Sequence, residues 1–290
     1  MMRTKKDYLI IYLKGIAMGA ADIVPGVSGG TIAFISGIYE ELINSIAAFK
    51  PELLKTLFKE GFVAVWQKVN GNFLATLIAG IMTSILLFAQ LIRHLLDSQP
   101  LFVWSFFFGL VLASVFILFN NIHRWRGQEM VALLTGIFLS GVVYFLPTTT
   151  AANITPSYIF FCAALAICAM ILPGISGSYV LVLLGVYRFM LDALHCFDFN
   201  IIAIFIGGAV IGLLCFAHFL KFLLNNYRNP ALALLTGFVA GSLVKIWPWS
   251  LLPEDSCFLA HYFYPILLII TGGTLVILIE TLGRRSAKNK

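Results

Sequence analysis

Long runs of apolar residues, separated by short polar segments, make up most of this chain. Runs of about 20 apolar residues are typical of helices that cross a lipid bilayer, and about six such spans are predicted. They cover residues 72–96, 101–119, 129–147, 199–224, 230–247 and 262–282. Two further apolar segments, 8–48 and 157–195, are each interrupted by a helix-breaking Pro-Gly pair. Because the arms on either side are shorter than a crossing helix, each segment is predicted to be a re-entrant hairpin. A pair of crossing helices is the alternative.

The two interruptions have nearly the same sequence. Residues 25–29 read Pro-Gly-Val-Ser-Gly, and residues 173–177 read Pro-Gly-Ile-Ser-Gly. A Gly-apolar-Tyr triplet follows each of them at the same distance, at 37–39 and at 185–187. Helices that break at corresponding places in two halves of a membrane protein are typical of transporters, which hold their substrate at such breaks.

The similarity between the halves continues beyond the interruptions. At a constant offset, the aligned pairs include Gly80 with Gly208, Arg93 with Lys221 and Gly109 with Gly237. The sequence therefore predicts two repeats, 1–147 and 148–290. The first repeat contains an extra segment, 50–69, in which basic and acidic residues alternate with large apolar ones. This segment is predicted to be an amphipathic helix on the inner membrane face.

The number of predicted crossings sets the relative orientation of the repeats. Three crossings separate the first hairpin from the second. Because that number is odd, the second repeat is inverted, and the hairpins enter the membrane from opposite sides. Their tips are expected to approach one another near the middle of the bilayer. The predicted fold class is an all-α polytopic membrane protein with inverted-topology repeats, about six full transmembrane helices and two re-entrant hairpins.

Composition and charge agree with this topology. Of the 290 residues, 60% are hydrophobic and only 11% are charged, which excludes an ordinary soluble domain. The net charge of +6 is not gathered on one surface, so no nucleic-acid partner is predicted. The segments expected outside, 97–100, 148–156, 196–198 and 248–261, contain no Lys or Arg. Basic residues confined to the inner side predict that both termini are cytoplasmic.

No pattern in the sequence is typical of a cofactor or metal site. The five cysteines form no Cys-x-x-Cys pair, and neither metal-ligand spacing nor a nucleotide-binding glycine fingerprint occurs. The cysteines are therefore interpreted as small apolar packing residues, and no cofactor and no metal are predicted.

The hairpin tips are the predicted substrate site. A helical arm begins just after each Pro-Gly pair, and its first turn leaves backbone N–H groups and a partial positive charge that suit a phosphate. The residues expected to bind it are Gly26, Ser28, Gly29, Gly30 and Thr31 in the first tip, and Gly174, Ser176, Gly177 and Ser178 in the second. Alternatively, Ser28 and Ser176 only cap the helices, and the glycines only permit the turns.

Four ionisable residues in the hairpins carry further predictions. Asp22 precedes the first break, and an intramembrane carboxylate is usually functional, so it is expected either to couple transport to H⁺ or Na⁺ or to repel the phosphate when ionised. Alternatively, Asp22 caps the backbone of the next arm. Glu40 and Glu41 are candidates for coupling or gating, and Arg188 is a candidate for collecting phosphate on the outer side. For these last three residues, the alternative is an ordinary position at the membrane interface.

The sequence around both breaks resembles the bacterial polyprenyl-phosphate transporter family. The similarity is carried by residues 14–31, Lys-Gly-Ile-Ala-Met-Gly-Ala-Ala-Asp-Ile-Val-Pro-Gly-Val-Ser-Gly-Gly-Thr, and by residues 171–178, Ile-Leu-Pro-Gly-Ile-Ser-Gly-Ser, and covers nearly the whole chain. The resemblance implies translocation of undecaprenyl phosphate from the outer to the inner leaflet of the bacterial cytoplasmic membrane, which recycles a carrier lipid. The implied partners are the polyprenyl phosphate lipid and the bilayer, without enzymatic activity. A homo-oligomer is left open.

Two competing functions are weighed against lipid-phosphate transport. Undecaprenyl-pyrophosphate phosphatase resembles this architecture and carries a Pro-Gly-x-Ser-Arg motif, but the Arg position is Gly29 in one tip and Gly177 in the other. Without a guanidinium, charge stabilisation for phosphoryl transfer is weaker. The second rival is a transporter of a small soluble anion. A lateral opening with an apolar groove for a tail favours the lipid, whereas a closed wall favours the small anion.

Overall fold

The protein is helical throughout the part of the chain that its computed structural model describes, which is residues 3–24, 27–122, 124–148, 154–251 and 262–288. Within these ranges no strand occurs, and the predicted all-α class is confirmed. The helices are α1 (Lys5–Ile23), α2 (Gly29–Ile35), α3 (Tyr39–Ile46), α4 (Glu52–Glu60), α5 (Phe62–Lys68), α6 (Gly71–Ser98), α7 (Pro100–Asn120), α8 (Gly127–Phe145), α9 (Pro156–Ile171), α10 (Gly177–Leu183), α11 (Tyr187–His195), α12 (Phe199–Asn226), α13 (Arg228–Ser242), the short 3-10 helix η1 (Pro248–Leu251) and α14 (Tyr264–Lys288).

Four of these helices, α6, α7, α8 and α12, are long and apolar enough to cross a membrane. They correspond to four of the six predicted spans. The predicted span at 230–247 is shorter than expected, because α13 ends at Ser242 after 15 residues. That length is about 22 Å, less than the hydrocarbon core. In α14, the apolar part whose side chains the structure describes is Tyr264–Leu278. The described residues therefore form a polytopic membrane protein.

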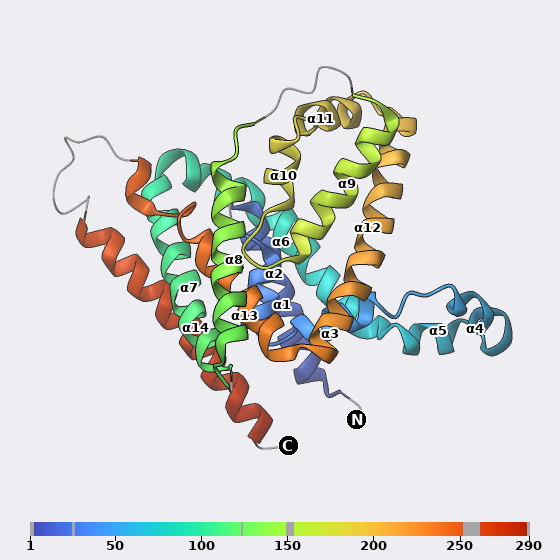
Figure 1. Ribbon diagram of the computed structural model, residues 1–290, viewed down its shortest axis with the longest axis horizontal. Helices are drawn as coiled ribbons and strands as arrows, with labels where there is room; N and C mark the ends of the chain where they lie inside the picture. The colour runs from blue at the N-terminus through green and yellow to red at the C-terminus, as the bar shows by residue number, and fades with distance from the viewer. Residues whose placement is uncertain (1–2, 25–26, 123, 149–153, 252–261, 289–290) are drawn as a thin grey trace.

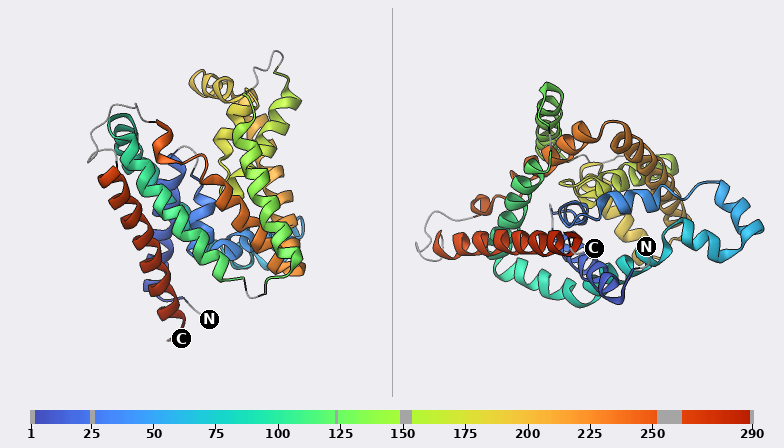
Figure 2. Two further views of the ribbon diagram at one scale, coloured as in Figure 1. Left: turned by 60° about the vertical axis from the view of Figure 1, so that its left-hand side comes forward. Right: turned by 90° about the horizontal axis from the view of Figure 1, so that it is seen from below.

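Each interrupted segment returns to the end of the molecule at which it enters. The start of α1 and the helix α3 lie at one end, drawn at the bottom of Figure 1, whereas the start of α9 and the helix α11 lie at the opposite end. Figure 2 shows the same separation from another side. This geometry agrees with re-entrant hairpins rather than crossing pairs. The start of α1 and the end of α14 lie at the same end, in agreement with the predicted topology.

The return arm of each hairpin is shorter than predicted, because it bends at a glycine. Gly37 and Gly185 have φ angles of +75° and +69°, in the left-handed region that glycine adopts readily. Both residues begin the Gly-apolar-Tyr triplets. As a result, α2 and α10 end after 7 residues each. The axis of α11 makes an angle of 105° with that of α10, so α11 lies across the upper end of the molecule (Figure 1).

The extra segment of the first half forms two helices, not the single amphipathic helix predicted for 50–69. Gly61, with φ of +83°, separates α4 from α5. The side chain of Lys68 closes the pair by donating to Thr56 Oγ1 at 3.0 Å and by approaching Glu60 at 3.3 Å. The two helices extend to one side of the bundle (Figure 1). They keep an amphipathic surface, because Phe58 is exposed among the charged residues.

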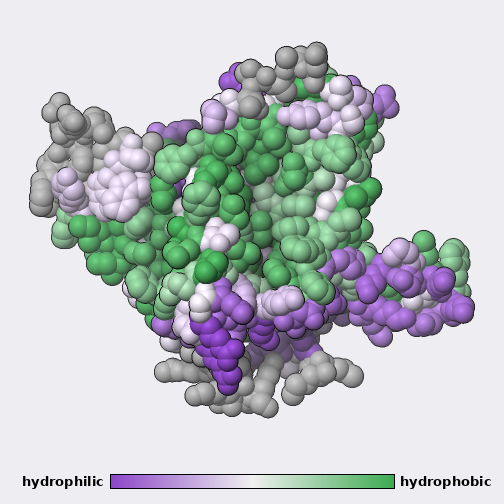
Figure 3. Space-filling view, viewed as in Figure 1, coloured by the Kyte–Doolittle hydropathy of each residue, from purple (hydrophilic) through white to green (hydrophobic). Residues whose placement is uncertain are grey.

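Four closely packed helix pairs form the bundle: α1 with α6, α9 with α12, α8 with α13, and α7 with α14. Small residues allow the helices to approach. A side chain at Gly80 would meet the carbonyl oxygen of Tyr12, and a side chain at Gly208 would meet the carbonyl oxygen of Phe160. These two contacts occupy aligned positions in the two halves. On the face drawn in Figure 3, the bundle is apolar over most of its height, and hydrophilic residues gather at its lower end.

Candidate functional site

The two interruptions meet inside the bundle. Thr31 Oγ1, in the first tip, accepts a 2.8 Å hydrogen bond from the N–H of Gly174 in the second tip. The hydroxyl of Tyr39, from α3, donates to the carbonyl oxygen of Ile171 at 3.2 Å. Segments from the two halves of the chain are therefore in direct contact at the breaks, as the sequence predicted. Gly26, a predicted site residue, lies outside the described residues.

The first tip is buried, and its amides already have acceptors. Asp22 Oδ1 accepts a 2.6 Å hydrogen bond from the N–H of Gly29, and Ser28 Oγ accepts a 3.1 Å bond from the N–H of Gly30. Ser28 and Thr31 are each 1% exposed, and both glycines are buried. In this conformation Asp22 and Ser28 therefore cap the backbone of α2, which was the alternative role for each of them.

The second tip is bonded differently. Ser176 makes no side-chain cap on α10, and its Oγ lies 2.9 Å from that of Ser178, which is exposed. The residue aligned with Asp22 is Met170, which supplies no carboxylate. Among the described residues, no hydrogen-bond acceptor is found for the amides of Gly177 and Ser178. The second tip therefore has one exposed hydroxyl, that of Ser178, and no carboxylate at the position aligned with Asp22, whereas Gly177 itself is buried.

Gly174 holds the contact between the tips. Its φ of +86° is in the left-handed region, and a side chain there would meet the carbonyl oxygen of Phe238 in α13. Its carbonyl oxygen accepts a 2.8 Å hydrogen bond from the hydroxyl of Tyr144 in α8. Because its N–H is bonded to Thr31, Gly174 links the second tip to both the first tip and the surrounding bundle.

An aromatic pair and a lysine, not identified from the sequence, lie beside the second tip. The rings of Tyr144 and Tyr179 are 5.3 Å apart between centroids, and the Tyr179 hydroxyl donates to the Tyr144 carbonyl oxygen at 3.2 Å. Lys245 Nζ lies 5.0 Å from the centroid of the Tyr179 ring, a cation–π contact. The sequence does contain a signal for this lysine, because Lys245 is the one basic residue within the apolar segment 230–247.

The glutamates predicted for gating lie at the lower end of the molecule, away from the tips. Glu41 accepts two hydrogen bonds from Arg3, at 2.5 and 2.6 Å, and one from Asn70 at 2.6 Å. Glu40 forms a 2.8 Å ion pair with Arg228. Because Glu40 belongs to α3 and Arg228 begins α13, this ion pair joins the two halves of the chain.

Arg188 is exposed on α11. In the part of the chain that the structure describes, it forms no ion pair, and no hydrogen bond links it to either tip. Its role as a phosphate collector stays a prediction. No group of three or more His, Cys, Asp and Glu that could hold a metal ion occurs in the same residues. The hydroxyls and amides at the tips and the nearby amine of Lys245 are groups that suit the binding of an anion, whereas the Asp22 carboxylate opposes it.

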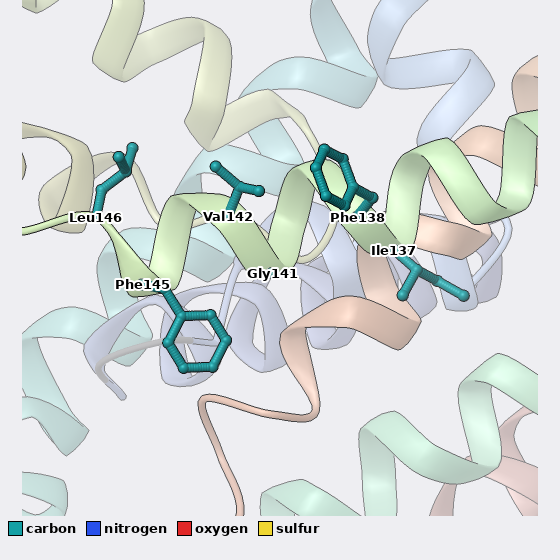
Figure 4. A pocket seen from close by; sticks show the side chains of 6 residues that line it. All are labelled: Ile137, Phe138, Gly141, Val142, Phe145 and Leu146. Carbon is teal, nitrogen blue, oxygen red and sulfur yellow. The ribbon is translucent and has the colours of Figure 1, made fainter.

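An open apolar groove of about 350 Å³ runs along α8. It is lined by Ile137, Phe138, Gly141, Val142, Phe145 and Leu146 (Figure 4). The adjacent Tyr144 contacts the second tip through its hydroxyl. All six lining residues belong to α8 or directly follow it, so the groove is an apolar surface on one helix. The lateral opening between helices that would favour a lipid over a small soluble anion stays a prediction.

Comparisons with known proteins identify the family of this chain. The family model described as undecaprenyl phosphate translocase-like matches residues 18–256. A polyprenyl-phosphate transporter of Vibrio cholerae serotype O1 is 49% identical over 247 residues, which cover 84% of this chain and 79% of that protein. A polyprenyl-phosphate transporter of Staphylococcus aureus is 30% identical over 296 aligned positions, covering 96% and 97%. No solved structure matches significantly. The chain therefore belongs to the undecaprenyl phosphate translocase-like family.

Proposed function

We propose that this protein moves polyprenyl phosphate, such as undecaprenyl phosphate, across the bacterial cytoplasmic membrane. An anionic headgroup cannot cross hydrocarbon unaided, so a path lined by polar groups must carry it while the tail stays in an apolar environment. The observation that carries the proposal is the contact between the two tips, Thr31 with Gly174, in a bundle with four helices that are long and apolar enough to cross a membrane. The names of the relatives point to the same substrate.

The two halves of the chain, 1–147 and 148–290, act as inverted repeats in this proposal. Supporting it, the hairpins open towards opposite ends of the molecule (Figure 1). The aligned glycines Gly80 and Gly208 also make equivalent backbone contacts with α1 and α9. In transporters built this way, one half rocks against the other around a central site.

Rocking requires that contacts between the halves break at one end of the molecule. The Glu40–Arg228 ion pair is such a contact, at the lower end. We assign it the role of a latch that holds the lower end closed when the substrate enters from above. Glu41, fixed by Arg3 and Asn70, keeps α3 against the start of α6 and so positions the latch.

We assign proton coupling to Asp22 as part of this proposal. As a carboxylate, Asp22 accepts the hydrogen bond from the N–H of Gly29 and occupies the position that a phosphate oxygen would take. Protonation removes that negative charge and allows the phosphate to reach the first tip. A proton that moves inward with the lipid also offsets the membrane potential, which opposes inward movement of an anion by about 2.3 kcal/mol per 100 mV.

Leaflet exchange in liposomes tests the proposed function. Purified protein is reconstituted with labelled undecaprenyl phosphate, and the fraction of label accessible from outside is followed over time. Wild-type protein is expected to exchange the lipid, whereas Ser28→Ala, Ser176→Ala and Arg188→Ala are expected to slow the exchange. Absence of exchange by the wild type contradicts the proposal. Release of phosphate from undecaprenyl pyrophosphate in the same vesicles would support the phosphatase instead.

A further inference from the structure

The two tips differ in a way that has consequences for where the substrate headgroup binds. At the first tip, the protein supplies its own anion, because the Asp22 carboxylate accepts the N–H of Gly29. At the second tip, the aligned residue is Met170, and Ser178 stands where the first tip has Gly30. The second tip therefore lacks the competing carboxylate. Each tip has two aliphatic hydroxyls, and of these four only that of Ser178 belongs to an exposed residue.

Lys245 is the cation that the structure brings to this tip. It follows α13, is exposed, and lies with Nζ 5.0 Å from the centroid of the Tyr179 ring. Tyr179 is the residue after Ser178, and its hydroxyl is bonded to the Tyr144 carbonyl oxygen. The Tyr144 hydroxyl in turn is bonded to Gly174. This chain of contacts fixes the Tyr179 ring beside the tip and holds the ammonium group close to it.

The chemistry of Lys245 suits a phosphate monoester. A lysine ammonium is a compact charge on a flexible stem, and it binds phosphate as a point charge. The aromatic ring supports the ammonium without neutralising it, unlike a carboxylate partner. In the described residues Lys245 forms no ion pair, so its charge is available to a ligand.

The groove on α8 gives this site a place for a lipid tail. Tyr144 reaches the second tip from α8, and the next residue, Phe145, lines the groove together with Val142 and Phe138 (Figure 4). A ligand with a phosphate at Lys245 can therefore direct an apolar chain along α8. Free phosphate offers the same headgroup chemistry but leaves the groove empty.

We propose that Lys245 and Ser178 bind the phosphate headgroup of the lipid that enters from the upper end, with its polyprenyl tail along α8. Tyr179 is a positioning residue, because it acts through Lys245. This inference rests on the proposed function. It adds a specific headgroup site, on the second tip, that Asp22 and the first tip do not share.

Binding to the purified full-length protein in nanodiscs tests the site. Three ligands are compared: undecaprenyl phosphate, the neutral undecaprenol and inorganic phosphate. Lys245→Met is expected to weaken undecaprenyl phosphate binding about 10-fold to 100-fold, the range for loss of one charged hydrogen bond, and to leave undecaprenol binding unchanged. Lys245→Arg, which keeps the charge, is expected to retain most of the affinity. Lys59→Ala, which removes an exposed lysine on α4, is the matched control.

A test of Tyr179 separates positioning from packing. Tyr179→Phe keeps the ring beneath Lys245 and is expected to bind nearly as well as the wild type, whereas Tyr179→Leu is expected to weaken binding of the phosphate lipid alone. Equal loss for undecaprenol would mean a general packing defect and would overturn the positioning role.

The outcomes separate this inference from the proposed function. If the wild type exchanges the lipid between leaflets but Lys245→Met binds it with unchanged affinity, the headgroup site is wrong and the transport function stands. If the wild type neither binds nor exchanges the lipid, the proposed function fails. If inorganic phosphate binds as tightly as undecaprenyl phosphate and is equally sensitive to Lys245→Met, the site serves a soluble anion, and the lipid assignment is overturned.

Discussion

Replacing Asp22 by asparagine tests how the first tip is linked to transport. Asparagine keeps an oxygen that can accept the hydrogen bond from the N–H of Gly29, which is 2.6 Å long in the native protein, but it cannot bind or release a proton. A hydrogen bond to a charged acceptor contributes about 1.5–3 kcal/mol, and a neutral one contributes about 0.5–1.5 kcal/mol. The variant is therefore expected to lose about 1 kcal/mol of unfolding free energy and to remain folded.

The effect on transport is expected to be larger than the effect on stability. A potential of 100 mV, negative inside, opposes inward movement of one negative charge by about 2.3 kcal/mol, which corresponds to about 50-fold in the equilibrium ratio. If a proton on Asp22 accompanies the lipid, this charge is cancelled. Wild-type transport should therefore rise as the pH falls through the titration of Asp22 and respond little to voltage. Asp22→Asn should lose the pH dependence and slow by up to about 50-fold under that potential.

The assay is leaflet exchange in liposomes at about pH 6 and about pH 8, with and without a potassium diffusion potential. Asp198→Asn is the matched control. Asp198 accepts bonds from the N–H groups of Asn200 and Ile201 at the start of α12, at 3.2 Å each, and asparagine caps a helix equally well. Proton coupling at Asp22 is refuted if Asp22→Asn keeps the pH and voltage dependence of the wild type.

Three further predictions concern the ion pair between the two halves, the second tip at Gly174 and the groove on α8. Arg228→Ala removes the ion pair with Glu40; the two side chains are 65% and 43% exposed, so the free energy of unfolding should change by less than about 1 kcal/mol. Reagents added from the lower end should label a cysteine introduced into the first tip faster in this variant than in the wild type. Exchanging the two charges between positions 40 and 228 should restore the slower labelling. Gly174→Ala should destabilise the protein by about 1–3 kcal/mol or more, measured as a lower Tm, because φ is +86° and an added Cβ would collide with the Phe238 carbonyl oxygen. The control Gly207→Ala, where an added Cβ would only touch a ring atom at 3.9 Å, should be nearly neutral. Equal effects of the two substitutions would contradict the argument. Phe138→Ala removes apolar surface from the groove and should weaken binding of a long-chain polyprenyl phosphate by about 10-fold. Binding of a short-chain analogue should be unaffected. An equal loss of affinity for both lipids would argue against a tail in the groove.

Much of the membrane topology is encoded locally and could be predicted from residue patterns. A lipid bilayer is a uniform apolar solvent, so a run of apolar residues such as 72–96 must become a helix that satisfies its own backbone. The helix breaks at the two Pro-Gly pairs could also be predicted, because proline has no backbone N–H to donate and its ring distorts a helix interior. The return arms bend at Gly37 and Gly185. Both glycines are visible in the sequence, but their positive φ angles became evident only in the structure.

The state of the candidate site could not be predicted from the same patterns. The repeated motif suggested two similar tips, both with amides available to an anion. In the structure the tips are unequal, because Asp22 reaches the N–H of Gly29 and its aligned partner, Met170, cannot do so. A hydrogen bond between residues of neighbouring arms depends on how the hairpin closes, which residue spacing alone does not specify.

The sequence by itself determined that the chain is a membrane protein with two broken, similar segments, because hydropathy, proline chemistry and repeats act over short stretches. The tertiary structure decided which groups face each other: Thr31 with Gly174, Glu40 with Arg228, and Lys245 with Tyr179. The members of the first two pairs are more than a hundred residues apart, and all three pairings arise only when helices from different parts of the chain pack together. Contacts of this kind depend on the relative placement of whole helices, and here they separate a self-capped tip from one that has an exposed Ser178 and no carboxylate cap.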